Sequence, residues 1–147
     1  MSHKQKRSYA ELHKIAGAFN RDNGYCALIA VCIATNASMG KVKRYMETMV
    51  NTGRRRKHGK GTPLDVIEKT TMRFGKKYDH YFMDAGYTGQ TLNRVHRDLQ
   101  KNFPNDTFYC LVNGHIACIR EGILEDWTAM SPSRRKVLKV WKIEERV

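Results

Sequence analysis

The sequence predicts an α+β domain in which helices come first and an antiparallel sheet follows. Apolar residues recur at helical spacing through the first half of the chain. The second half alternates short apolar runs with the turn signals Asn113-Gly114 and Glu121-Gly122, which are typical of β-hairpins. Helices followed by antiparallel strands indicate an α+β architecture. We therefore expect N-terminal helices packed on a C-terminal antiparallel sheet.

The first two helices are expected over residues 8 to about 19 and 26 to about 35. Ser8 and Glu11 have the spacing of a capping box, in which both side chains bind free amides at a helix start. Turn-forming residues fill positions 20–25. The run that follows is apolar on every side, which predicts a central buried helix rather than a surface helix.

Two more helices precede the sheet. Ser38 caps the third, in which Val42, Tyr45, Met46, Met49 and Val50 recur at helical spacing before Gly53 ends it. The fourth starts at Thr62-Pro63, since proline is tolerated in a first turn, and Gly75 ends it. Its inward face is predicted to consist of Leu64, Ile67, Thr71 and Phe74.

The remaining pattern alternates and predicts mostly strands. One further helix is expected over 91–102, with Leu92, Val95 and Leu99 turned inward. Strands are expected over residues 78–83, 107–112, 115–120, 123–127 and 137–143.

The length of 147 residues fits one compact domain, here residues 8–147, after a basic and flexible N-terminus at 1–7. The longest apolar run, 26–34, is far shorter than the roughly 20 residues of a membrane span. The N-terminus leads into no apolar signal core, so we expect a cytoplasmic protein without a membrane partner. The four cysteines have no close spacing, and we expect them to be free thiols.

Positive charge is concentrated in three segments. Lys and Arg outnumber Asp and Glu by 27 to 14, for a formal net charge of +13. The excess lies in residues 1–7, 41–60 and 133–142. It indicates either a solubilising surface or a polyanionic partner, namely nucleic acid or an acidic protein. The candidate partner-binding residues are Arg54, Arg55, Arg56, Lys57, Lys60, Arg134, Arg135 and Lys136.

A cysteine, a histidine and an aspartate that follow one another along the chain suggest the chemistry of a thiol enzyme. Cys26 opens the apolar helix, where the amides of a helix N-terminus stabilise a thiolate. His115, on an expected strand, is a candidate general base and acid, and Asp126 across the next hairpin is a candidate to orient its ring. Asn20 and Asn23 are candidates to bind an oxyanion together with backbone amides.

This layout resembles the papain-like cysteine peptidase superfamily. The similarity rests on a nucleophile at the start of a central helix, then Gly114-His115-Ile-Ala-Cys-Ile119, then Asp126-Trp127. Asn20 stands six residues before Cys26, where papain-type enzymes place an oxyanion Gln. Asn23-Gly24-Tyr25-Cys26 is also similar to the Asp-Gly-x-Cys opening of ovarian-tumour-type deubiquitinases. The resemblance implies a papain-like fold, a Cys-His-Asp triad, a peptide or protein substrate, and neither metal nor cofactor.

Other interpretations remain open. Cysteine is often buried, so Cys26 alone is also consistent with a core position, and we expect Cys32, Cys110 and Cys118 to be packing residues. His115 and Asp126 are also consistent with ordinary turn-flanking positions. In function, the alternative to a hydrolase or acyl-transfer enzyme is a nucleic-acid-binding or adaptor protein on a catalytically inactive papain-like scaffold. In that alternative Tyr45 and Tyr87 are candidate stacking partners for bases.

Overall fold

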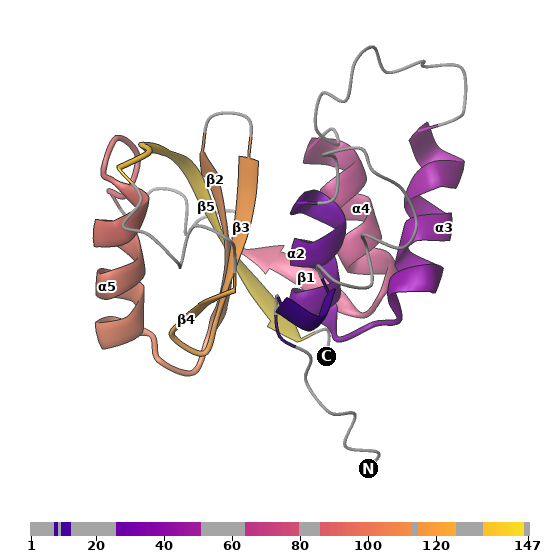
Figure 1. Ribbon diagram of the computed structural model, residues 1–147, viewed down its shortest axis with the longest axis horizontal. Helices are drawn as coiled ribbons and strands as arrows, with labels where there is room; N and C mark the ends of the chain where they lie inside the picture. Colours follow the sequence, from indigo (N-terminus) through magenta and orange to yellow (C-terminus); the bar gives the residue numbers. More distant parts are fainter. Residues whose placement is uncertain are drawn as a thin grey trace.

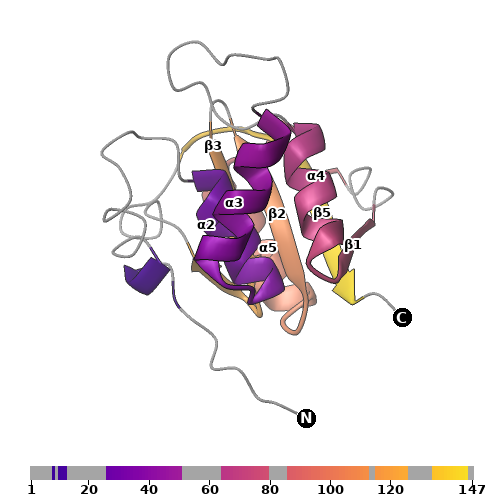
Figure 2. The same cartoon turned by 90° about the vertical axis from the view of Figure 1, so that its right-hand side faces the viewer.

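A five-stranded antiparallel sheet separates two helical layers in the computed structural model (Figure 1). The structure describes residues 8, 10–12, 26–50, 64–79, 86–112, 115–125 and 134–145. Helices α2 (Cys26–Thr35), α3 (Met39–Val50) and α4 (Leu64–Arg73) cover one face of the sheet, and α5 (Leu92–Asn102) covers the other. Figure 2 shows the three-helix layer in front of the strands. The order of helices and strands agrees with an α+β domain.

The strand order of the sheet is β1-β5-β2-β3-β4. Strands β2 and β3 form a hairpin with a two-residue loop, closed by the pair Val112 and His115. Strands β3 and β4 form another, in which Glu121 and Gly122 have φ of 54° and 79°, as a type I′ turn requires. The strands are β1 (Lys76–Asp79), β2 (Thr107–Val112), β3 (His115–Arg120), β4 (Ile123–Glu125) and β5 (Val137–Glu145).

Side chains of successive strand residues enter different helical layers, because their directions alternate. On β2 and β3, Tyr109 and its cross-strand partner Cys118 join the core under α2, α3 and α4. Cys110 and its partner Ala117 join a separate cluster under α5. The domain therefore has two cores, one on each side of the sheet.

A buried polar contact ties the three-helix layer to the sheet. The Thr71 hydroxyl lies 2.7 Å from the Ile67 carbonyl and 2.9 Å from the Tyr109 hydroxyl. Thr71 has one hydroxyl proton, and back-bonding to the i−4 carbonyl uses it. The Tyr109 hydroxyl therefore donates to the Thr71 oxygen, so neither buried oxygen lacks a partner.

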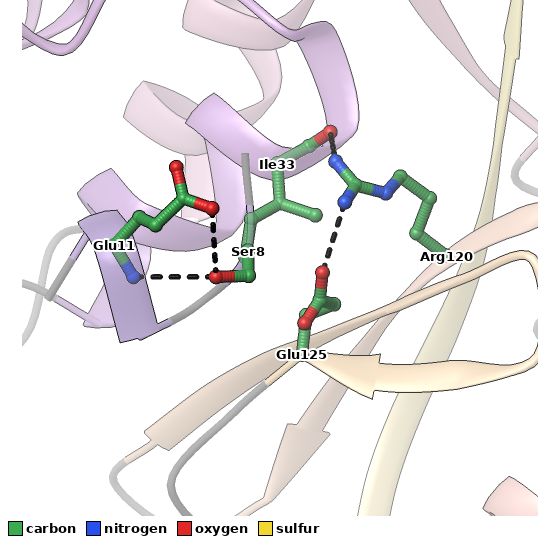
Figure 3. Close-up of polar contacts among 5 residues, drawn as sticks. All are labelled: Ser8, Glu11, Ile33, Arg120 and Glu125. Carbon is green, nitrogen blue, oxygen red and sulfur yellow. Dashed lines mark hydrogen bonds and ion pairs between the residues drawn. The ribbon is translucent and has the colours of Figure 1, made fainter. Parts of the chain in front are cut away.

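The predicted helix bounds agree closely with the structure where it describes them. The helix expected over 26–35 spans those residues, and the inward positions Leu92, Val95 and Leu99 of α5 are all buried. The Ser8 capping interaction is confirmed: the Glu11 amide donates to the Ser8 hydroxyl oxygen at 3.3 Å (Figure 3). The turn expected at 20–25 lies outside the described residues.

Two details of the predicted pattern were wrong. Leu64, placed on the inward face of the fourth helix, is 38% exposed. The buried positions of α4 are instead Val66, Ile67, Thr70 and Thr71, so the inward stripe is shifted around the helix. The first strand begins at Lys76 rather than 78, because it pairs with the end of β5. Of the strand expected over 78–83, the structure describes only the part up to Asp79.

Candidate functional site

Helix α2 is enclosed on all sides and begins at Cys26. Every residue from Ala27 to Ala34 is at most 7% exposed. The helix packs on β3 and also contacts α3 and α4. Such a position requires apolar residues around the whole circumference, as this segment provides. The sequence therefore places a cysteine at the first residue of the most enclosed helix that the structure describes.

The C-terminal end of α2 is held by a charged residue of the sheet. Arg120, the last residue of β3, donates through Nη1 to the Ile33 carbonyl at 3.2 Å (Figure 3). Its Nη2 donates to Glu125 Oε2 at 2.9 Å, and the two side chains are only 13% and 12% exposed. A cation at a helix C-terminus satisfies an otherwise unpaired carbonyl and interacts favourably with the helix dipole. The Arg120–Glu125 pair thus fixes α2 against the β3–β4 hairpin.

This contact also sets the direction of α2 relative to β3. Ile33 lies in the last turn of α2, and Arg120 ends β3, so helix and strand run the same way. A ten-residue helix and a six-residue strand have similar lengths, about 15 to 20 Å. The first residues of α2 and β3, Cys26 and His115, therefore lie at the same end of the sheet. Figure 1 shows α2 packed against the sheet at β3.

The strand register places the His115 side chain on the other face. His115 pairs with Val112, and cross-strand partners project to the same side of a sheet. Val112 belongs to the core under α5, whereas α2 packs on the opposite face. His115 is 7% exposed, so its ring is enclosed on the α5 side of the sheet end. The structure thus brings Cys26 and His115 to the same end of the sheet. The His115 side chain, however, leaves the backbone on the face opposite to α2.

The remaining predicted triad and oxyanion residues, Asp126, Asn20 and Asn23, lie outside the described residues. The structure describes the backbone of Cys26 but not its side chain. The prediction that Cys32, Cys110 and Cys118 are packing residues is confirmed, since all are buried free thiols. Five of the predicted partner-binding residues also lie outside the described residues, namely Arg54, Arg55, Arg56, Lys57 and Lys60.

The second basic segment is exposed beside the start of α5. Arg134, Arg135 and Lys136 lead into β5, and all three are exposed. The Leu92 amide donates to the Arg135 carbonyl at 2.8 Å, and Lys136 forms a bridge with Thr91. The segment is therefore attached by backbone pairing to the N-terminus of α5.

Sequence reasoning missed three further cations on α5. Arg94, Arg97 and Lys101 are exposed at i, i+3 and i+7, so they share one side of the helix. The signal was present as helical spacing, but these residues lie outside the three segments in which the net charge was located. The net charge was located by stretches of sequence, so this one-sided arrangement of three cations beside the single acidic residue Asp98 was overlooked.

One predicted stacking partner was wrong. Tyr87 is 7% exposed, and its hydroxyl donates a hydrogen bond to Asp98 Oδ2. Burial and the Asp98 carboxylate raise the pKa of the Tyr87 phenol above its ordinary value. A ring enclosed in this way presents no face for a base. Tyr45 is half-buried, with Phe74 edge-on to its ring and the Arg73 guanidinium 5.9 Å from the ring centre.

His115 is not among the lining residues of either of two hollows that described residues line. One, of about 310 Å³, lies at the far end of α2, with Asn36, Lys76, Arg120 and Lys142 among its lining residues. The other, of about 610 Å³, lies along α5 and is lined by Tyr87, Gln90, Arg94, Arg97, Asp98 and Lys101.

Within the described part of the chain, His, Cys, Asp and Glu form no group of three suited to a metal ion. No helix among the described residues is long and apolar enough to cross a membrane.

The chain matches no family model, no curated protein and no solved structure.

Proposed function

We propose that the protein is a cysteine peptidase-like hydrolase or acyl-transfer enzyme in which Cys26 is the nucleophile and His115 is the general base. The observation that carries the proposal is the position of Cys26 as the first residue of enclosed helix α2, at the end of the sheet where His115 begins β3. A helix N-terminus favours a thiolate, and a nearby imidazole is the usual partner that activates a thiol. The resemblance to the papain-like superfamily supports the same assignment.

In the proposed reaction the Cys26 thiolate attacks the carbonyl carbon of an acyl or peptide substrate. A sulfur–carbon bond forms, the bond to the leaving amine breaks, and the His115 imidazolium gives its proton to that amine. Water then hydrolyses the thioester, with the same imidazole as base. Asp126 is the proposed orienting residue, and Asn20 or Asn23 the proposed oxyanion donor.

The register of β3 sets a condition on this proposal. Because the His115 side chain starts on the α5 side of the sheet, it must approach the Cys26 thiol around the end of β3. His115 is the first residue of its strand, so the approach passes the end of β3 and does not cross the sheet. Whether the His115 imidazole contacts the Cys26 thiol is therefore the first property to measure, before any substrate is sought.

The test is alkylation with iodoacetamide from about pH 5 to 9, with mass spectrometry to locate the modified cysteine. We expect fast labelling of Cys26 near pH 6 in the wild type, because a thiolate–imidazolium pair persists well below the ordinary thiol pKa of about 8.5. In His115→Gln the labelling rate should instead rise only above about pH 8. The buried Cys32, Cys110 and Cys118 serve as internal standards that should remain unlabelled while the protein is folded.

The matched control is His96→Gln. His96 lies on α5, and its Nε2 is 2.9 Å from the Gly122 carbonyl, so the change removes an imidazole elsewhere in the domain. It should leave the pH dependence of Cys26 labelling unchanged. A wild-type rate that follows an unperturbed thiol, or an equal response to both His variants, would contradict the proposal. Activity against acyl substrates that survives Cys26→Ala would also contradict it.

A further inference from the structure

The outward side of α5 is a row of cations. Leu92, Val95 and Leu99 are fully buried against the sheet, so the opposite side of the helix faces solvent. Arg94, Arg97 and Lys101 project from that side. At a rise of about 1.5 Å per residue, the row extends over about 10 Å. It borders the 610 Å³ hollow along the helix.

Backbone pairing extends this row to the basic segment before β5. The Val137 amide donates to the Gln90 carbonyl at 2.8 Å, and the Leu92 amide donates to the Arg135 carbonyl at the same distance. These bonds hold Arg134, Arg135 and Lys136 beside the first turn of α5. We call the six residues Arg94, Arg97, Lys101, Arg134, Arg135 and Lys136 the α5 basic surface.

The cations of the α5 row differ from those that the structure pairs elsewhere. Lys43 pairs with Glu47, and Lys142 with Asp106 and Glu144. No ion pair within the described ranges involves Arg94, Arg97 or Lys101. The carboxylate in the hollow, Asp98, accepts hydrogen bonds from the Tyr87 hydroxyl and, at 2.9 Å, from the Asn102 amide. The positive charge of the row is therefore available to an external anion.

We propose that the α5 basic surface binds the phosphate backbone of double-stranded nucleic acid without regard to base sequence. Two joined rows of Arg and Lys match a repeating line of phosphates rather than one anionic group. Tyr87 is the aromatic residue among the described lining residues of the hollow, and it is buried, so these residues present no ring on which single-strand bases would stack. The same described lining residues include no exposed apolar side chain of the kind that anchors a protein partner.

The surface lies on the face of the sheet opposite to α2, so this binding is separate from the proposed thiol chemistry. It requires neither a reactive Cys26 nor an assembled triad. The two proposals can therefore fail independently, since alkylation tests one and nucleic-acid titration tests the other.

The experiment is fluorescence anisotropy of a labelled mixed-sequence duplex of about 20 base pairs, titrated with protein at about 50 to 300 mM NaCl. Each phosphate contact contributes about 0.9 to the slope of log affinity against log salt. We expect the variant R94Q/R97Q/K101Q to lose roughly 2.7 from that slope, and affinity to fall roughly tenfold per lost contact at about 0.1 M salt. A second duplex of different sequence should bind equally well.

The matched control is K41Q/R44Q/K69Q, which removes three exposed cations from α3 and α4 on the other side of the sheet. Its net charge equals that of the α5 variant, so a general charge effect would lower both affinities alike. Circular dichroism confirms that both variants are folded, and Arg97→Gln alone should remove about 0.9 of the slope if the triple variant unfolds.

Three outcomes would overturn the proposal. One is an equal loss of slope in the two triple variants, and another is the absence of wild-type binding at the lowest salt. The third is tighter binding to a single strand of equal length, or to poly-glutamate of equal charge, than to the duplex. Tighter binding to the single strand would assign the surface to single-stranded nucleic acid, and tighter binding to poly-glutamate would assign it to an acidic protein.

Discussion

On one face of the sheet α2 is enclosed by β3, α3 and α4, whereas on the other face α5 is packed on one side only. Helix α2 has no polar side chain facing solvent between Ala27 and Ala34, whereas α5 has a row of exposed cations. An enclosed helix holds its terminal residue at a defined place relative to the strands. A half-exposed helix presents side chains to a partner. The two faces are therefore suited to different tasks, one to positioning and the other to surface binding.

The largest expected difference between the faces concerns core truncation. Ile33→Ala in α2 and Leu99→Ala in α5 each remove a side chain that is at most 1% exposed. Such changes cost about 2 to 5 kcal/mol, and the cost rises when the surroundings cannot collapse into the cavity. We expect Ile33→Ala near the upper limit and Leu99→Ala near the lower one, measured by urea denaturation. If Leu99→Ala costs as much as Ile33→Ala, α5 is held as rigidly as α2 and the contrast fails.

The next effect concerns the pair that fixes α2. Glu125→Gln removes the carboxylate charge 2.9 Å from the Arg120 guanidinium, whose side chain is 13% exposed. Removing one partner of a largely buried pair is costly, and we expect a loss of about 2 kcal/mol in unfolding free energy. The control Glu47→Gln acts on the exposed Lys43–Glu47 pair and should cost less than about 0.5 kcal/mol. Equal costs would show that the Arg120 contact does not anchor the helix.

On the α5 face the corresponding contact is the partly buried Tyr87–Asp98 hydrogen bond. Tyr87→Phe should cost about 1.5 kcal/mol near neutral pH, because a hydrogen bond to a carboxylate is lost. The control Tyr45→Phe changes a half-buried ring and should cost less.

The pH dependence of this contact has a defined sign. The pKa of Tyr87 is raised in the folded protein, so the contribution is fully present below the unfolded-state pKa of 10.0. Above about pH 10 the unfolded phenol ionises while the folded one stays protonated, and the contribution is progressively lost. The stability advantage of wild type over Tyr87→Phe should therefore shrink between about pH 9.5 and 11. An advantage that stays constant or grows over this range would contradict the buried, carboxylate-bound phenol.

The smallest effect concerns the start of α5. Thr91 caps the helix, its hydroxyl oxygen accepting from the Arg94 amide at 3.3 Å. Thr91→Ala should lower the unfolding free energy by about 1 kcal/mol, as measured by urea denaturation, whereas Thr91→Ser should restore most of it. The same cap orients the first turn of the α5 basic surface. A change below about 0.2 kcal/mol would show that the backbone bonds to residues 135–137 alone define this helix start.

The sequence by itself determined the bounds and buried sides of most described elements. Local signals sufficed for α2, α5, β2 and β3, because apolar patterning and two hairpin turns act over a few residues. The same local signals placed Cys26 at a helix start and His115 at a strand start. They also identified Cys32, Cys110 and Cys118 as core residues.

Only the tertiary structure decided how these elements face one another. The pairing of β1 with β5 joins segments some 60 residues apart, and the placement of α5 opposite α2 depends on the complete sheet. The side of His115 follows from its register with Val112, and a shift of one residue would move the ring to the other face. The position of Arg135 beside the first turn of α5 likewise depends on hydrogen bonds between distant backbone segments. Local sequence patterns determine elements, whereas long-range pairing energies determine which side chains share a surface.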